Sequence, residues 1–304
     1  MLGNIFYWVF NMSIAASIAG AVIVALRQIK KLPKRLVHLL WMIPFLRAVV
    51  PFGISGKYGL MSLFSKFATK TVVVYELREE PLVTTMNFLQ SAKSYFPIEY
   101  KSNVLENLFD TASLIWLCGV VALVIAFFAI YFTTLHELSA SEHFRDNIYF
   151  SKKVDVPAVY GILKPKIILP ICAKKMDTKY ILMHEKAHIR RGDNLFRILG
   201  FLVVFLHWFN PLSWVFLKLF LADCELACDE SVLKSCGKDE KKLYASALLD
   251  FKENATVFAS AFGGAKVRTR IENILSYKKM SVFSLICFVI LWCAIFYFLL
   301  TNAM

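Results

Sequence analysis

Several long apolar segments constrain this chain more than any other feature, because each is long enough to cross a lipid bilayer. They comprise residues 4–26, 36–54, 112–134, 195–220 and 281–301. About 20 consecutive apolar residues span the hydrocarbon core of a membrane. The chain is 58% hydrophobic with a mean hydropathy of +0.57, so much of its apolar surface is expected to face lipid. The sequence therefore predicts a mainly α-helical, polytopic membrane protein.

The positions of the basic residues predict how these segments are oriented. A cluster without acidic residues follows the first segment and consists of Arg27, Lys30, Lys31, Lys34 and Arg35. Short basic loops remain on the cytoplasmic side of a membrane. Residues 1–54 are therefore expected to form an N-terminal transmembrane hairpin whose N-terminus lies outside the cell. The net charge of +13 then indicates attraction to the lipid bilayer, with no direct nucleic-acid partner.

The same rule predicts on which side of the membrane each remaining segment lies. Residues 55–111 form an external loop in which opposite charges balance, and residues 112–134 return the chain to the cytoplasm. The loop either receives a signal or a partner, or it only connects two spans. Residues 135–280 are expected to form a cytoplasmic domain, and residues 281–301 a C-terminal transmembrane helix.

A metal-binding pattern lies within the cytoplasmic domain, where residues 184–188 read His-Glu-Lys-Ala-His on a helix predicted to end at Gly192. Positions four apart share a helix face, so His184 and His188 can bind one zinc ion. Glu185 is turned by about 100° and can instead accept a proton from a water molecule at the metal. This is the pattern of a zinc protease. The alternative is an exposed helix on which the two histidines occur together by chance.

A catalytic zinc site needs a third protein ligand and keeps one position for water. Glu225 and Asp229, beyond the next apolar segment, lie four positions apart and share a helix face. Glu225 is the predicted third ligand, which makes the site gluzincin-like, and Asp229 is predicted to orient a ligand histidine. A solvated acidic face is the other interpretation of this pair. Cys224 and Cys228 remain alternative ligands, although a cysteine would favour a closed, structural site.

The apolar segment 195–221 separates the two halves of this predicted site. A single membrane crossing would leave His184 and Glu225 on opposite sides of the bilayer. Asn210-Pro211 divides the segment into parts of about 15 and 10 residues, each too short to cross. A re-entrant hairpin is therefore predicted, and His207 within it is expected to be a hydrogen-bonded core residue rather than a ligand.

Short strands are predicted before the metal-binding helix, at residues 148–151, 158–162 and 166–169. Such a small sheet either packs against the helix or holds an extended peptide along an open edge strand. Residues 135–280 are thus expected to form a zinc metalloprotease domain that carries a small β-sheet and is inserted between transmembrane helices.

In combination, these motifs resemble one family. The residues that carry the resemblance are His184-Glu185-Lys-Ala-His188, Asp193, Asn210-Pro211, Glu225-Leu-Ala-Cys-Asp229 and the stretches 157–170 and 270–275. They resemble the membrane metallopeptidases of the BlaR/MecR antirepressor type, the signal transducers of inducible β-lactam antibiotic resistance. With the pattern of spans, the resemblance covers essentially the whole chain.

The resemblance implies a site, a location and partners. The expected zinc ligands are His184, His188 and Glu225. Glu185 is the expected catalytic base, and Asp229 and Asp193 are expected to support the ligands. The protein would be a multi-pass protein of the bacterial plasma membrane whose active site faces the cytoplasm. Its expected substrates are a transcriptional repressor of the BlaI/MecI type and its own chain, and a homodimer is a further expectation.

One feature departs from the family pattern. Full-length members carry an external penicillin-binding domain after the last span, where this sequence ends. The chain is therefore expected not to react with β-lactams itself, and its signal would arrive through residues 55–111 or a separate sensor protein. Two alternatives stay open, namely a housekeeping membrane protease of the heat-shock or CAAX-prenyl sort and a non-catalytic membrane receptor. The stretches 157–170 and 270–275 argue against the first, and Glu185 argues against the second.

Overall fold

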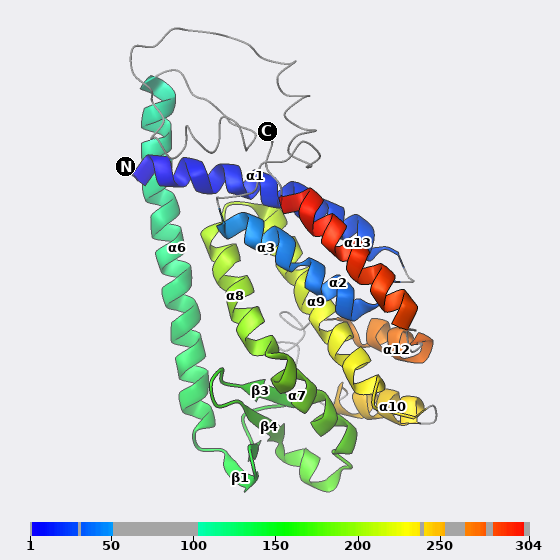
Figure 1. Cartoon of the computed structure of the whole chain (residues 1–304). Coiled ribbons are helices and arrows are strands. Elements are labelled where there is room, and N and C mark those ends of the chain that lie inside the picture. Colours follow the sequence, from blue (N-terminus) through cyan, green and yellow to red (C-terminus); the bar gives the residue numbers. More distant parts are fainter. Residues whose placement is uncertain are drawn as a thin grey trace.

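The computed structural model describes residues 2–29, 32–50, 103–237, 240–252, 265–277 and 282–300. Within these ranges the chain is mostly helical and carries one small mixed sheet (Figure 1). The predicted fold class is confirmed in this coarse form. Residues 55–102 of the predicted external loop lie outside the described residues, so that part of the prediction stays a prediction.

Among the described residues, two helices are long and apolar enough to cross a membrane. They are α1 (Leu2–Arg27) and α6 (Asn103–Leu138). Figure 1 shows α6 along one side of the molecule, from the region of α1 to the sheet. Only 11% of the most apolar window of α6 is buried inside the protein. Such a long, exposed apolar surface is stable against lipid rather than water.

The predicted span 36–54 begins as two short helices, α2 (Lys34–Leu40) and α3 (Met42–Val49). Pro44 explains the interruption, because a proline ring clashes with the carbonyl group four residues earlier in a helix. That carbonyl belongs to Leu40, where α2 ends. Residues 51–54 lie outside the described part of the chain, so a membrane crossing by this segment stays a prediction.

The predicted interruption of the segment 195–221 is present. Helix α8 (Asp193–Leu206) ends before Asn210, and α9 (Pro211–Leu233) begins after it. The Asn210 side chain accepts a hydrogen bond from the backbone amide of Leu212, which caps α9. The two helices form a hairpin, but α9 has 23 residues where a part of about 10 was predicted. At about 1.5 Å per residue it is not too short to cross a membrane, so entry of the hairpin into a membrane stays a prediction.

The sheet contains four short strands in the order β1-β2-β4-β3. They are β1 (Glu142–Arg145), β2 (Ile148–Ser151), β3 (Ala158–Tyr160) and β4 (Lys166–Pro170). β2 and β4 are parallel, and the other two pairs are antiparallel. The last three strands match the predicted ones. The sequence does not predict β1 because all of its side chains are exposed and none alternates with a buried one.

Helix α9 contributes to two hydrophobic cores. The first core contains the sheet, the C-terminal half of α9, η1 (Ile171–Lys175), α7 (Lys179–Arg191), α10 (Glu240–Lys252) and α12 (Val267–Ser276). The second contains the N-terminal half of α9 with α1, α2, α3, α8 and α13 (Val282–Leu300). His207 is buried between α8 and α9, and its Nε2 lies 3.0 Å from the carbonyl oxygen of Ala48, so it is the hydrogen-bonded core residue that was predicted. α9 thus joins the apolar helices to the half of the molecule that contains the predicted site.

Candidate metal centre

Helix α7 carries the two histidines of the motif on its buried face. It begins at Lys179 and is terminated by Gly192, whose left-handed φ of +69° is readily adopted by glycine. The side chains of His184 and His188 are almost completely buried, and because they are four positions apart they project from the same side. Their Nε2 atoms lie 3.1 Å apart.

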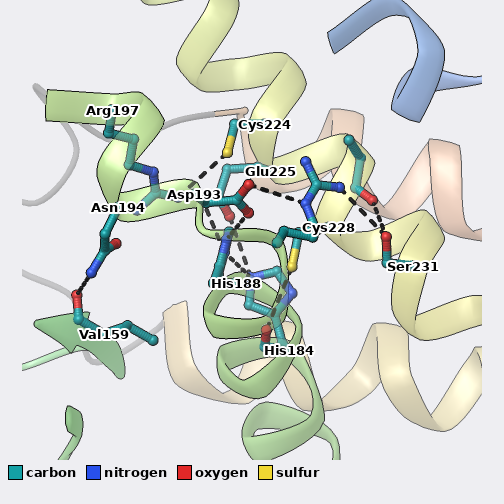
Figure 2. A network of polar contacts seen from close by, with 12 residues as sticks. Val159, His184, His188, Asp193, Asn194, Arg197, Cys224, Glu225, Cys228 and Ser231 are labelled. Carbon is teal, nitrogen blue, oxygen red and sulfur yellow. Dashed lines mark hydrogen bonds and ion pairs between the residues drawn. The ribbon is translucent and has the colours of Figure 1, made fainter. Parts of the chain in front are cut away.

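The carboxylate of Glu225, on α9, faces both imidazoles (Figure 2). Its Oε2 lies 3.4 Å from His184 Nε2, and its Oε1 lies 3.6 Å from His188 Nε2. The α8–α9 hairpin therefore brings together the three side chains that the sequence singled out as ligands. The apolar segment lies between these residues in the sequence, but it does not lie between their side chains in the structure.

Asp193 holds the ring of His188 from the far side. The residue begins α8 directly after Gly192, and its Oδ2 lies 2.6 Å from His188 Nδ1. Its other oxygen accepts a hydrogen bond from Arg191 Nε at 3.1 Å. With Nδ1 engaged in this way, the Nε2 atom of His188 is directed toward Glu225.

Asp229 holds the ring of His184 in a similar manner, partly through Tyr244 of α10. His184 Nδ1 lies 2.8 Å from the Tyr244 hydroxyl and 3.3 Å from Asp229 Oδ1. The Tyr244 hydroxyl donates to that same oxygen at 2.6 Å, so His184 Nδ1 donates to the hydroxyl oxygen. Both imidazoles therefore present Nε2 to the space beside Glu225. The sequence contains no signal that would have identified Tyr244.

The charges around this space favour a cation. Burial alone would lower the pKa of His188, but the adjacent Glu225 carboxylate raises it well above its ordinary value. Burial alone would raise the pKa of Glu225, but His188 and a hydrogen bond from His184 keep it well below its ordinary value. Two imidazoles whose outer nitrogens are hydrogen bonded, together with one carboxylate, form a donor set that suits Zn²⁺. The residues present therefore fit a zinc ion.

Two arginines complete the surroundings of Glu225. Arg270, on α12, binds Asp229 with Nη2 at 2.7 Å and Nε at 2.9 Å, and its Nη1 lies 3.4 Å from Glu225 Oε2. Arg197, on α8, pairs with Glu225 Oε1 at 2.5 Å. Neither residue belongs to a metal-binding motif of the sequence, although Arg270 opens the stretch 270–275 that supported the resemblance.

Glu185 differs from the other carboxylates of the site. It is only 6% exposed, yet among the described residues its carboxylate has no hydrogen-bond or ion-pair partner. Its negative charge also affects Tyr160 on β3. The pKa of Tyr160 is raised mainly by burial and to a smaller extent by Glu185. Unlike Asp193, Glu225 and Asp229, Glu185 is therefore not held by an ion pair among the described residues.

The thiols of Cys224 and Cys228 are buried and free on the same stretch of α9. The Cys228 sulfur and one ring nitrogen each of His184 and His188 all lie within 4.8 Å of one another. Cys224 groups instead with His38 and Asp193. The structure thus distinguishes the two alternative cysteine ligands that the sequence left open, and Cys228 is the one that lies beside both imidazoles.

Residues 7–275 match the model of a protein family described as BlaR1 peptidase M56. The chain belongs to this family. The matched range includes every residue of the candidate centre, from His184 to Arg270. The family that the motifs indicated is therefore confirmed.

Three relatives of this chain are similar over shorter regions. The methicillin resistance mecR1 protein of Staphylococcus aureus is 33% identical over 106 residues, which are 34% of this chain and 18% of the relative. The regulatory protein BlaR1 of Bacillus licheniformis is 27% identical over 158 residues, 48% of this chain and 26% of the relative. The regulatory protein BlaR1 of Staphylococcus aureus is 32% identical over 117 residues, which are 36% of this chain and 20% of the relative. The chain thus spans about a fifth to a quarter of the length of these relatives.

Proposed function

We propose that this chain is a membrane-embedded zinc endopeptidase that acts in signal transduction. The observation that carries the proposal is the convergence of His184, His188 and Glu225, from α7 and α9, on one buried point. These three residues would hold the zinc ion and leave one position for water, as in other catalytic zinc sites. Membership in a peptidase family supports the same conclusion.

Glu185 is the proton carrier in this proposal. A bound zinc ion lowers the pKa of a water molecule and polarises the carbonyl group of a peptide bond. Glu185 accepts the proton from the attacking water and returns it to the nitrogen of the leaving amine. Because no cation partner holds its carboxylate among the described residues, Glu185 is available for both transfers.

The neighbouring acids hold the ligands in position and take no part in proton transfer. Asp193 fixes the ring of His188, and Asp229 fixes the ring of His184 directly and through Tyr244. Loss of such a partner lets the ligand ring rotate away from the metal, which weakens metal binding without removing a ligand.

The edge strand β3 is the proposed site for an extended peptide. It has β4 on one side only, and it packs against α7, which carries Glu185. The Asn194 side chain donates to the carbonyl oxygens of Val159 and Gly161 at 3.0 and 3.1 Å (Figure 2). Since Asn194 follows Asp193, these bonds set the spacing between the edge strand and His188. A peptide placed along this strand would lie beside the candidate centre.

The proposed setting is the bacterial plasma membrane, with several membrane crossings, an outside N-terminus and a centre that faces the cytoplasm. The two long apolar helices and the basic cluster after α1 support this arrangement. The proposed substrate is a transcriptional repressor of the BlaI/MecI type, with the chain itself as a second substrate. A signal from a separate sensor protein, and association of two copies, belong to the same proposal.

Co-expression with a repressor of the BlaI/MecI type tests the proposal. The full chain is expressed beside the repressor in wild-type and Glu185→Gln forms, and the metal content of each purified form is measured. We expect about one zinc ion per chain in both forms, and a shortened repressor only with the wild-type chain. A zinc-loaded wild-type chain that leaves the repressor intact would assign the enzyme to other substrates. Metal-free chains in both forms would overturn the zinc peptidase itself.

A further inference from the structure

Cys228 lies on the face of α9 that points at the candidate centre. It follows Glu225 by three positions, so the two side chains leave the helix about 60° apart. Its thiol is fully buried and donates to the backbone carbonyl oxygen of His184 at 3.5 Å. Together with the ring nitrogens of His184 and His188, the sulfur belongs to a group of donor atoms that all lie within 4.8 Å of one another. Figure 2 shows Cys228 between α9 and the two histidines.

With a divalent cation bound, the net charge around the centre would favour a further negatively charged ligand. The acidic side chains that contact the imidazoles are Asp193, Glu225 and Asp229, and the guanidinium groups that pair with them are those of Arg191, Arg197 and Arg270. These three negative and three positive charges cancel, so a divalent cation would leave a net positive charge in a buried space. Unbalanced buried charge is unfavourable, and a thiolate would reduce it.

We propose that Cys228 is a fourth zinc ligand in the resting protein, so that the centre is closed until this ligand is released. The inference rests on the proposed zinc peptidase. On coordination the thiol proton leaves to water, the hydrogen bond to the His184 carbonyl is lost and a zinc–sulfur bond forms. Four protein ligands characterise structural zinc sites, whereas hydrolysis needs a position for water. The resting protein is therefore latent, and activation exchanges the Cys228 sulfur for water.

Cys224 provides the matched comparison. It lies one turn before Cys228 on the same helix and is equally buried, but its sulfur lies 4.0 Å from Arg197 Nη2 and groups with His38 and Asp193. Cys224 is also hydrogen bonded to the ring of His188, but it does not belong to the group of donor atoms that His184 and His188 form with Cys228. Replacement of Cys224 therefore tests the loss of a nearby thiol without the loss of a ligand.

X-ray absorption at the zinc edge of the purified, zinc-loaded wild-type chain is the decisive measurement, because it needs no variant. We expect one sulfur neighbour at about 2.3 Å beside nitrogen and oxygen neighbours at about 2.0–2.2 Å. A zinc ion surrounded by nitrogen and oxygen alone would overturn the role of Cys228 and leave the proposed peptidase intact. A chain that binds no zinc would overturn the peptidase proposal, and the role of Cys228 with it.

Cobalt substitution gives a second readout that separates ligand loss from misfolding. The wild-type chain, Cys228→Ala, Cys224→Ala and the exposed control Cys172→Ala are stripped of metal and loaded with Co²⁺. We expect a thiolate-to-cobalt charge-transfer band in every form except Cys228→Ala, and faster repressor cleavage by zinc-loaded Cys228→Ala than by the wild type. A band that persists in Cys228→Ala, or one that only Cys224→Ala loses, would overturn the assignment. If Cys228→Ala does not fold, the zinc-edge spectrum of the wild type decides alone.

Discussion

Helix α9 buries acidic residues on two opposite faces, and the comparison of these faces separates the proposed site from its support. One face points toward α7 and carries Glu225 and Asp229. The other carries Asp223 and Glu230, which are seven positions apart and therefore lie on one side of the helix. Glu225 is turned by about 160° from Asp223. Asp223, Asp229 and Glu230 are buried and the Glu225 side chain is only 15% exposed, so burial alone does not identify the site.

On the face that points away from α7, every acidic side chain meets donors that the fold already supplies. Both oxygens of Asp223 accept from Arg27 Nε, at 2.8 and 2.9 Å, and one also accepts from Trp41 Nε1 at 2.9 Å. Glu230 accepts from the backbone amides of Lys34 and Arg35 at 2.9 and 3.1 Å, and so caps the N-terminus of α2. These contacts tie α1 and α2 to α9 without help from a metal.

On the face that points toward α7, the Glu225 carboxylate meets two imidazoles whose outer nitrogens are already occupied. Two guanidinium groups also lie beside it, yet the imidazole Nε2 atoms still point at a shared space. Convergence of several donors on one point therefore distinguishes a metal site from a structural ion pair. Substitutions on the two faces test this distinction.

Glu225→Gln should abolish the metal site. The amide keeps the shape of the side chain but removes the charge that pairs with the cation, so zinc affinity is expected to fall by more than about a hundredfold, which exceeds the loss of an outer partner. Repressor cleavage should fall below detection. Zinc titration of the purified chain checks this result, and a variant that binds zinc normally would contradict the assignment of Glu225.

Asp223→Ala should damage the other face and leave the metal site intact. Loss of this carboxylate leaves Arg27 and the Trp41 indole without their partner, which is expected to cost about 3 kcal/mol of folding stability. Thermal unfolding in detergent measures the effect, and zinc content serves as the control. Loss of zinc from the folded Asp223→Ala chain would show that the two faces are not separable.

Asp193→Asn should weaken metal binding without unfolding the chain. The amide no longer holds the His188 ring as an anion does, and such outer partners affect metal affinity by about 10- to 100-fold. Zinc competition with a chelator measures the change. Asn194→Ala is the neighbouring control, because Asn194 contacts β3 and not a ligand, so its zinc affinity should equal that of the wild type.

Glu230→Gln should have the smallest effect. An amide oxygen can still accept one hydrogen bond from α2, but the negative charge at the helix N-terminus is lost, which costs about 0.5–1 kcal/mol. The thermal midpoint should fall by less than for Asp223→Ala, with unchanged zinc content. A larger fall than for Asp223→Ala would reverse the order of importance on this face.

Local rules of helix and strand formation predicted much of this molecule. The spacing of His184 and His188, the end of α7 at Gly192 and the interruption before Pro211 all depend on neighbouring residues only. Three of the four strands were predicted from their apolar residues, whereas β1 is exposed along its whole length and was not predicted. The sequence also indicated that Glu225 and Asp229 share a face, because that follows from helix periodicity.

Sequence motifs and helix periodicity were enough to establish the family, the mainly helical class and the pair of histidines on one helix face. The tertiary structure decided that Glu225 and Asp229, the pair that the sequence had singled out, face these histidines, because α9 carries acids on both sides and its rotation depends on how α2 and α7 pack against it. It also brought Tyr244 and Arg270 to the centre from α10 and α12. Their contacts with His184 and Asp229 join residues that are far apart along the chain, and such contacts arise only when separate helices share a core.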